Sequence, residues 1–176
     1  GVYNAYNALC AIGIGISCGI SLADIKKALS TACGVKGRAE VVPTDTDYTV
    51  MIDYAHSPDG LENICHTLKD CATGRLLVLF GCGGDRDRTK RPIMGRIGVA
   101  ESDFAIITSD NPRTEDPMAI IEDILKGVDS SMGDYIVVPE RRNAIRYAMD
   151  IAKKDDIIIL AGKGHETYQE ICGVKY

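Results

Sequence analysis

Three glycine-rich, charged segments of the chain each follow directly after an apolar run of strand length. The segments are residues 81–92, 109–113 and 162–166, and the apolar runs before them are residues 75–80, 104–108 and 157–161. The carboxyl ends of parallel strands meet at one edge of a sheet, and α/β proteins bind ligands in the crevice there. The pattern therefore predicts one convergent site for a charged ligand.

The side chains in these segments indicate which groups the ligand carries. Arg86 and Arg113 each offer a planar guanidinium that can pair with a carboxylate or phosphate through two hydrogen bonds. Asp110, Asn111 and Glu166 supply oxygen acceptors that suit an ammonium group. A zwitterion with more than one carboxylate satisfies both sets, so the sequence favours such a ligand.

Each segment also has a plainer interpretation when it is taken alone. Arginines between aspartates, as at residues 85–88, often form surface ion pairs of little energetic value. Residues 110–112 can form a simple turn, in which Pro112 stiffens the chain before Arg113. His165 can be a structural histidine held by a hydrogen bond. It is the combination of segments that favours a binding site.

A second group of polar residues follows the predicted strand at residues 48–53. Ser57 and Pro58 are typical of a helix start, the serine as cap and the proline at the first helical position. A helix start presents free N–H groups to anions, so Asp53 and His56 are candidates to hold a ribose or a base. A filled helix cap beside a buried histidine is the alternative interpretation.

Hydrophobic periodicity and cap residues predict a regular alternation of strands and helices after about residue 37. The expected helices are residues 58–71, 91–101, 117–127 and 140–153, and the expected strands are residues 40–42, 48–53, 75–80, 104–108, 135–138 and 157–161. Strands joined by helices at this spacing form right-handed crossover units. We expect an α/β fold with a mainly parallel sheet and helices on both of its faces.

The first 35 or so residues do not follow this alternation. Residues 4–17 and 21–33 read as helices and resemble the end of a preceding domain. Asn4 and Asn7 share one helix face, and Arg38 follows the hinge after these helices. These polar residues can be simple contacts between two domains. Because the chain begins inside a predicted helix without a methionine and ends in what reads as mid-strand, we expect a fragment.

Composition is that of an ordinary soluble globular protein, with 176 residues of which 45% are hydrophobic and 26% charged. The net charge of -5 argues against a general nucleic-acid or membrane-surface partner, since both require a basic face. The seven cysteines include no Cys-x-x-Cys pair, so we expect reduced thiols in a cytoplasmic protein. The apolar residues 8–20 are too few to span a bilayer.

Two familiar nucleotide-binding motifs do not fit the glycine-rich segments. Residues 81–86 lack the third glycine of the dinucleotide-binding fingerprint. Gly162 and Lys163 are followed by glycine, where a Walker A loop has serine or threonine. Any phosphate loop is therefore expected outside this sequence.

Six segments, in this order and at this approximate spacing, resemble the Mur ligases of peptidoglycan synthesis. They are residues 4–8, 37–40, 53–59 and 81–87, Asp-Asn-Pro-Arg at 110–113 and Gly-Lys-Gly-His-Glu at 162–166. The resemblance runs from about Asn4 to Gln169 and is greatest to the members that add meso-diaminopimelate. It implies that residues 1–36 are the last helices and hinge of a central ATPase domain. Residues 37–176 would then be a Rossmann-like C-terminal domain, truncated at its end.

The resemblance also implies a reaction and the residues that serve it. Such ligases use ATP and Mg²⁺ to join an amino acid to UDP-N-acetylmuramoyl-L-alanyl-D-glutamate through an acyl phosphate. The implied contacts to meso-diaminopimelate are Arg86, Asp110, Asn111, Pro112, Arg113, Gly162 and Glu166, and those to ATP are Asn7, Arg38, Asp53 and His56. The magnesium ligands and catalytic groups belong mostly to the family's central domain. The chain alone is therefore expected to be inactive, and its partners to be small-molecule substrates and its own N-terminal and central domains.

The segment at residues 110–113 further implies which amino acid is added. Meso-diaminopimelate has a distal carboxylate that Arg113 can clamp, whereas L-lysine lacks it and would leave the guanidinium unpaired. The resulting discrimination is roughly a hundredfold or more. The alternatives are a lysine-adding Mur ligase, a ligase like the folylpolyglutamate synthetases, and a stand-alone binding module without catalysis.

Overall fold

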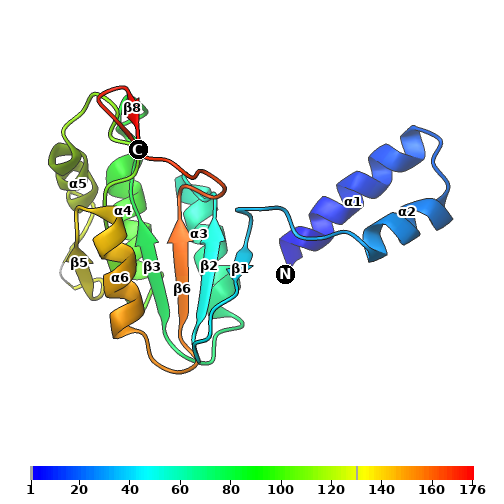
Figure 1. The fold of residues 1–176 in the computed structure, drawn as a ribbon, viewed down its shortest axis with the longest axis horizontal. Helices are drawn as coiled ribbons and strands as arrows, with labels where there is room; N and C mark the ends of the chain where they lie inside the picture. Colours follow the sequence, from blue (N-terminus) through cyan, green and yellow to red (C-terminus); the bar gives the residue numbers. More distant parts are fainter. Residues whose placement is uncertain (1, 130) are drawn as a thin grey trace. The chain divides into compact units, whose positions relative to one another are not determined.

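The computed structural model describes residues 2–129 and 131–176, and it divides the chain into two compact units. The smaller unit ends at Gly34 and the larger begins at Val35 (Figure 1). The side chains of residues 2–4, which include the predicted contact residue Asn4, lie outside the described part.

The smaller unit is a pair of helices, α1 (Val2–Ser17) and α2 (Leu22–Ser30). Ser21 caps α2 as expected, because its hydroxyl oxygen accepts a hydrogen bond from the Asp24 amide at 3.2 Å. The helix ends before the predicted residue 33, since the Thr31 hydroxyl donates to the Ala28 carbonyl and closes the last turn. Several large apolar side chains of this pair are exposed, namely Tyr6, Leu9, Ile14, Ile16, Ile20 and Leu22.

The larger unit is built on a six-stranded sheet in the order β1-β2-β6-β3-β4-β5. The strands are β1 (Glu40–Val42), β2 (Thr49–Asp53), β3 (Leu76–Phe80), β4 (Phe104–Ile107), β5 (Tyr135–Val137) and β6 (Ile157–Ala161). Only β1 runs antiparallel, so among the described residues the mainly parallel sheet is confirmed. Parallel pairing brings the carboxyl ends of β2, β3, β4 and β6 to one edge, as the sequence predicts.

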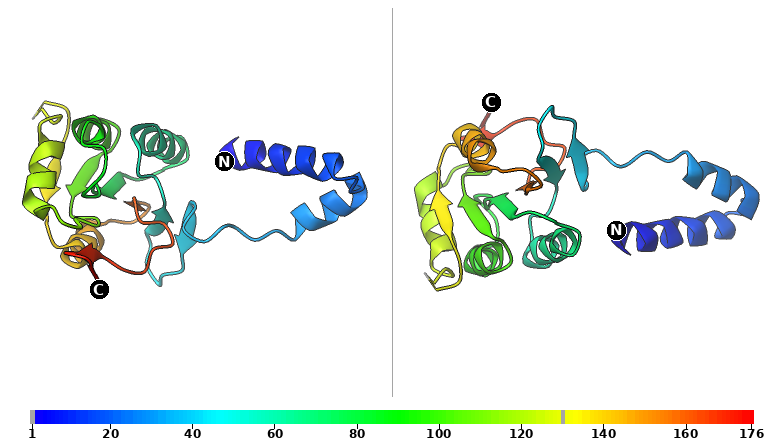
Figure 2. Two further views of the ribbon diagram at one scale, coloured as in Figure 1. Left: turned by 90° about the horizontal axis from the view of Figure 1, so that it is seen from above. Right: turned by 90° about the horizontal axis from the view of Figure 1, so that it is seen from below.

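Helices cover both faces of this sheet, as expected, but unequally (Figure 2). The helices are α3 (Pro58–Lys69), α4 (Lys90–Ala100), α5 (Pro117–Leu125) and α6 (Arg141–Ile151). Alternate residues of β3 serve the two sides: Leu76, Val78 and Phe80 pack with α3, α4 and α5, whereas Leu77 and Leu79 pack on the face that α6 covers. Every residue of β3 is consequently buried, which explains its continuous apolar run.

A short hairpin near the end of the chain was not predicted. It joins β7 (Glu170–Ile171) to β8 (Val174–Lys175), so the end of the chain is the second strand of a hairpin. Cys172 and Gly173 turn the chain with φ angles of 49° and 77°, the left-handed pair that a type I′ hairpin turn requires. Strands of two residues carry no recognisable alternation, which is why the sequence pattern did not show them.

No helix within residues 2–129 and 131–176 is long and apolar enough to cross a membrane. All seven cysteines are free thiols. Cys65 and Cys82 are buried, and burial raises the pKa of each thiol to about 12, so both stay protonated at neutral pH.

A buried ion pair fixes the amino ends of β3 and β6. The Asp156 carboxylate accepts hydrogen bonds from Nη2 of Arg75 at 2.7 Å, from the Arg75 amide at 2.8 Å and from the Lys153 amide at 2.8 Å. The Asp156 side chain is only 3% exposed. Burial raises the pKa of this carboxyl, but the hydrogen bonds from Arg75 and Lys153 outweigh burial, and the pKa lies below its ordinary value.

Replacing Asp156 is expected to destabilise the larger unit in a pH-dependent way. At pH 7, Asp156→Asn should lower the free energy of unfolding by about 2 kcal/mol, because the Arg75 guanidinium, whose side chain is 36% exposed, loses its charged hydrogen-bond partner. A carboxyl whose pKa is lowered by folding stabilises above its unfolded pKa of about 3.9, and this stabilisation disappears as the pH falls through the folded pKa. Urea unfolding of both proteins at pH 7 and pH 3 should therefore show a difference that shrinks at pH 3.

The control for this experiment is Asp150→Asn, which removes the same charge from an exposed position of α6. It should leave the urea midpoint nearly unchanged. An equal loss of stability at both pH values in the Asp156 variant would contradict the assigned ion pair.

Candidate functional site

A cavity of about 270 Å³ lies at the edge where β2, β3, β4 and β6 end. Six residues predicted to bind the amino acid line it, namely Arg86, Asp110, Asn111, Arg113, Gly162 and Glu166. His56, predicted as a nucleotide contact, also lines it, together with Tyr54, Cys82 and Lys90, which were not predicted. The structure thus brings the three glycine-rich segments into one site.

Pro112 was predicted as a contact, but it is not among the residues that line this cavity. Its carbonyl oxygen lies against Gly84, where a Cβ atom would collide with it. In the same way, a Cβ atom on Gly81 would collide with the Thr108 carbonyl oxygen. These glycines let the loop after β3 lie directly against the loop after β4, and the Gly84 amide donates to the Asn111 carbonyl at 2.9 Å.

Arg91 on α4 contacts both the loop after β3 and the loop after β4. Its guanidinium is fully buried and donates to the two Glu115 oxygens at 2.7 and 3.0 Å and to Asp123 on α5 at 2.9 Å. Glu115 also accepts from the Asp85 amide at 2.7 Å and from Arg88. Hydrogen bonds from Arg91, Arg88 and that amide lower the pKa of Glu115 to about 2, so it remains a carboxylate at neutral pH.

The two arginines predicted to bind the ligand differ in how many contacts their guanidinium groups already make within the protein. Arg86 is exposed, and its one hydrogen bond to a described residue runs to the Asp85 carbonyl at 3.1 Å. Arg113 donates through Nη1 to the Gly84 carbonyl at 2.7 Å, and its Nε lies 3.5 Å from Glu170 of the unpredicted hairpin. The ion-pair interpretation of residues 85–88 therefore holds for Arg88, which pairs with Glu115, while Arg86 lines the cavity.

The acceptor side of the cavity includes a lysine that was not predicted. Nζ of Lys163 donates to Oδ1 of Asn111 at 2.7 Å and lies 3.4 Å from Oε2 of Glu166. Nδ2 of Asn111 donates to the same Glu166 oxygen at 2.8 Å. Residues 110–112 are therefore more than a turn, because the Asn111 amide connects the loop after β4 to the loop after β6.

Arg141 lies buried behind these acceptors. It donates through Nη2 to the Ala161 carbonyl at 2.9 Å, and its Nη1 lies 3.9 Å from Oδ2 of Asp110. Nη1 of Arg141 and Oδ2 of Asp110 make no hydrogen bond with any described residue. Burial lowers the pKa of Arg141, while the charges of Asp110 and Glu166 oppose that effect. The signal in the sequence was an arginine in the same helical stripe as the buried Ala144 and Ala148.

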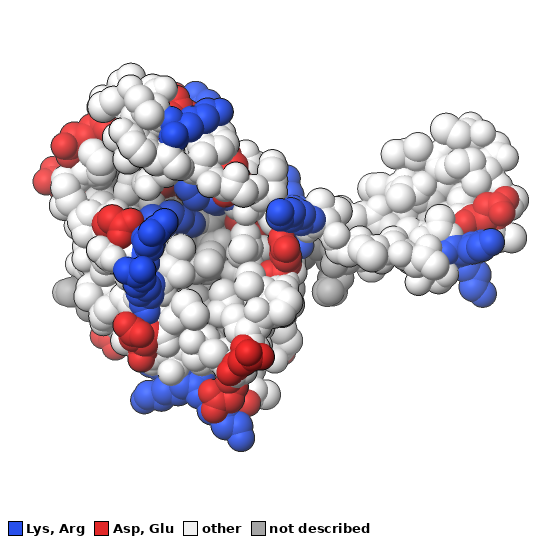
Figure 3. All heavy atoms as spheres, in the orientation of Figure 1, with Lys and Arg blue, Asp and Glu red and all other residues white. Residues whose placement is uncertain are grey.

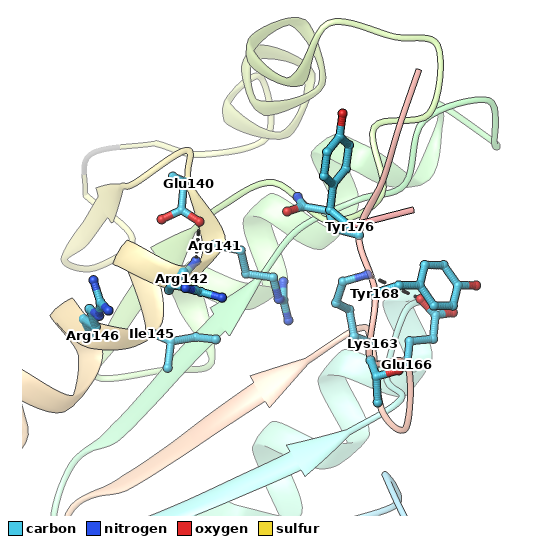
Figure 4. Close-up of a pocket in the computed structure, with 11 residues that line it drawn as sticks. Glu140, Arg141, Arg142, Ile145, Arg146, Lys163, Glu166, Tyr168 and Tyr176 are labelled. Atoms are coloured by element: carbon cyan, nitrogen blue, oxygen red, sulfur yellow. Dashed lines mark hydrogen bonds and ion pairs between the residues drawn. The ribbon is translucent and has the colours of Figure 1, made fainter. Parts of the chain in front are cut away.

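A wider groove of about 770 Å³ runs along α6 on the other side of Lys163 and Glu166 (Figures 3 and 4). Arg141, Arg142 and Arg146 of α6 form one side of it, and Tyr168 lies on the other. Lys163 and Glu166 thus stand between this groove and the cavity at the strand ends, and Glu166 lines both.

The residues predicted to contact a nucleotide gather around Tyr54, except for Asn7, which lies on α1 in the smaller unit. The Arg38 guanidinium carbon lies 4.9 Å from the centre of the Tyr54 ring, and the exposed His56 ring lies 4.6 Å from it. Both Asp53 oxygens accept from backbone amides, those of Ala39 at 2.7 Å and Ala55 at 2.8 Å. Asp53 therefore holds the chain on either side of this cluster, and His56 is not the buried histidine of the alternative interpretation.

The other glycine-rich loop approaches the same cluster. A Cβ atom on Gly37 would collide with the His165 amide, and Gly164 lies against Tyr54 in the same way. His165 is exposed, with its ring 5.7 Å from that of Tyr54. No group of three or more His, Cys, Asp or Glu side chains in the described part of the chain is arranged to hold a metal ion.

Guanidinium groups and carboxylates thus line the same cavity. Arg86 and Arg113 suit a carboxylate, and Asp110 and Glu166 suit an ammonium group. An α-amino acid presents both groups on one carbon, so this arrangement can bind and orient one end of a zwitterion.

Comparison with known proteins places this geometry in a family. The model of the family described as "Mur ligase, glutamate ligase domain" matches residues 37–164. Over 171 residues the chain is 57% identical to a UDP-N-acetylmuramoyl-L-alanyl-D-glutamate--2,6-diaminopimelate ligase of Clostridium botulinum, covering 96% of this chain and 35% of that protein. It is 51% identical to the ligase of the same name from Clostridioides difficile, covering 100% and 36%. The chain therefore spans about a third of the length of these curated relatives.

Solved structures agree with this relationship. A ligase with the same diaminopimelate name superposes with a TM-score of 0.78 at 40% identity, covering all of this chain and 36% of that one. A folylpolyglutamate synthase of Mycobacterium tuberculosis, in complex with ADP and AMPPCP, has a TM-score of 0.70 at 22% identity and covers 92% of this chain, which shows a shared fold alone. The family model matches residues 37–164, which include every residue that lines the charged cavity except Glu166, and the chain belongs to the Mur ligase family.

Proposed function

We propose that this chain supplies the amino-acid pocket and part of the ATP site of a ligase that adds meso-diaminopimelate to UDP-N-acetylmuramoyl-L-alanyl-D-glutamate during peptidoglycan precursor synthesis. The observation that carries the proposal is the cavity that Arg86 and Arg113 line together with Asp110 and Glu166. The names of the most similar curated relatives support it. The free thiols suit a cytoplasmic enzyme.

Meso-diaminopimelate fits this arrangement because it carries an amino group and a carboxylate at each end. One end binds with its carboxylate at Arg113 and Arg86 and its ammonium at Glu166 and Asp110. The amino group at the other end then stays free to react. Once neutral, it attacks the carbonyl carbon of the D-glutamyl acyl phosphate; phosphate leaves, and the nitrogen loses a proton as the amide forms.

The cluster around Tyr54 is the proposed contribution to the ATP site. Arg38, Tyr54 and His56 together offer a cation and two flat rings, which suit a phosphate and a base. Asp53 acts through the backbone amides that it holds. Asn7 of α1 is a further proposed contact to ATP. No cluster of side chains among the described residues could hold a magnesium ion, and the proposal assigns Mg²⁺ binding to the central domain.

We further propose that residues 1–36 belong to a central ATPase domain and residues 37–176 to the C-terminal domain of the ligase. The exposed apolar side chains of α1 and α2 support this division, because a helix that is apolar on most sides is usually buried in a larger protein. The proposed partners are the N-terminal and central domains of the same ligase. We expect the isolated chain to be inactive, since the resemblance assigns the magnesium ligands and the catalytic groups mostly to the central domain.

The proposal is tested with the complete ligase by measuring phosphate release from ATP. The UDP-N-acetylmuramoyl dipeptide is supplied with either meso-diaminopimelate or L-lysine. Turnover with diaminopimelate alone supports the reaction and the amino acid together. Turnover with L-lysine favours the lysine-adding alternative, and no turnover with either amino acid overturns the proposal.

The pocket assignment predicts a selective defect when Arg113 is truncated. In the complete ligase, Arg113→Ala should raise the KM for meso-diaminopimelate about a hundredfold, because the ligand's carboxylate loses a charged partner. The control is Arg96→Ala, which removes an exposed arginine from α4 outside the cavity. An unchanged KM in a folded Arg113 variant would remove Arg113 from the pocket.

The nucleotide assignment predicts the opposite selectivity for Arg38. Arg38→Ala should raise the KM for ATP about fivefold, the loss expected from one partly exposed cation beside an aromatic ring. The KM for meso-diaminopimelate should stay the same. Lys36→Ala serves as the matched control on an exposed neighbour. Equal changes in both constants would show that Arg38 supports the fold of the unit rather than the nucleotide.

A further inference from the structure

Lys163 is a largely buried cation to which the proposed function gives no role. Its side chain is only 12% exposed, and a cation in such a place needs oxygen partners. The partners are Oδ1 of Asn111 at 2.7 Å, Oε2 of Glu166 at 3.4 Å and Oδ1 of Asp110 at 4.0 Å. All three belong to the acceptor side of the cavity, so Lys163 touches the binding residues without lining the cavity itself.

The contact with Lys163 is one of three that fix which way the Asn111 amide points. Oδ1 of Asn111 accepts from Lys163 and from the Glu170 amide at 2.9 Å, while Nδ2 donates to Glu166 at 2.8 Å. If this amide were turned over, its NH₂ group would face an ammonium and an N–H group, which are both donors only. The amide is therefore held with its donor toward Glu166.

The orientation of Asn111 in turn decides how Glu166 presents its carboxylate. Oε2 of Glu166 receives both Nδ2 of Asn111 and Nζ of Lys163. The hydrogen bonds among the described residues leave Oε1 of Glu166 open, and Glu166 lines the cavity. One oxygen is thus tied to the protein and the other is available for a ligand.

Charge gives Lys163 a second effect on the same acceptors. Asp110 and Glu166 are like charges that face one cavity, and like charges in a partly buried site repel each other. Lys163 lies within 4.0 Å of both, while Arg141 lies 3.9 Å from the far oxygen of Asp110. The two cations thus offset the repulsion between the two carboxylates.

We propose that Lys163 is a positioning residue of the amino-acid pocket: it holds the Asn111 amide and the Glu166 carboxylate so that the remaining Glu166 oxygen and Asp110 receive the ammonium of the bound amino acid. This inference rests on the proposed function. Lys163 touches no ligand itself, and it acts through the residues that do.

The test is the kinetics of the complete ligase carrying Lys163→Met, which keeps the length of the side chain and removes its charge. We expect the KM for meso-diaminopimelate to rise at least tenfold, with kcat changed less than threefold and the KM for ATP unchanged. Lys154→Met removes an exposed lysine from the same unit and should change none of these constants. An unchanged KM for meso-diaminopimelate, or an equal rise in both KM values, overturns the proposal.

A double-mutant cycle with Glu166→Gln separates positioning from general support of the fold. If Lys163 acts through Glu166, Lys163→Met should raise the KM at least tenfold in the wild-type background but less than threefold beside Glu166→Gln. Equal effects in the two backgrounds overturn the proposal. If Lys163→Met does not fold, Lys163→Gln replaces it in the same cycle, because it keeps an N–H donor for Asn111.

Failure of the inference and failure of the proposed function give different results. A wild-type ligase that does not turn over meso-diaminopimelate overturns the proposed function, and the inference with it. If the wild-type ligase turns over meso-diaminopimelate and the Lys163 variants have an unchanged KM for it, the inference alone is overturned.

Discussion

The buried pair of Arg91 and Glu115 is the interaction on which the candidate site depends. A fully buried guanidinium is costly to desolvate, and Arg91 is stable in its place because Glu115 binds it through both oxygens and Asp123 accepts a further hydrogen bond. Glu115 also accepts from the Asp85 amide, so one carboxylate joins α4 to the loops after β3 and β4. Those two loops carry Arg86 and Arg113. The contacts of Glu115 with Arg91 and Asp85 therefore fix the positions of the two loops relative to each other.

The positively charged residues of this region fall into two groups, those that are buried and paired with a carboxylate of the protein and those that are not. Arg91, Lys163 and Arg141 are largely or fully buried, and each has a carboxylate within 4.0 Å. Arg86 is exposed and uses one hydrogen bond on its neighbour's carbonyl. A site that binds a zwitterion needs both kinds, because the buried cations hold the carboxylates in place and the exposed one remains available to the ligand.

Hydrophobic periodicity predicted the fold well because each long element presents a continuous or alternating apolar face. The five buried residues of β3 and the capped start of α3 are examples. The hairpin of β7 and β8 could not be predicted in this way, since its pairing depends on the turn at Cys172 and on contact with Arg113. The motifs likewise located the side chains at the strand ends. They included Arg91 and Lys163 but not Arg141, and they could not show what these cations contact, because partners such as Glu115, Asn111 and Asp110 lie far away in the sequence.

Two of the predicted contact residues show how a motif can mark a position without showing its chemical use. Asn111 and Asp53 both lie at strand ends, but the Asn111 oxygen already accepts from Lys163 and the Glu170 amide, its NH₂ group donates to Glu166, and both oxygens of Asp53 hold backbone amides. A side chain with its donors and acceptors already used is a poor direct ligand, because every new hydrogen bond must replace one inside the protein. Such a residue serves binding best by fixing its neighbours. On this reasoning the open Glu166 oxygen becomes the main acceptor of the cavity, since Asn111 and Lys163 hold only its other oxygen.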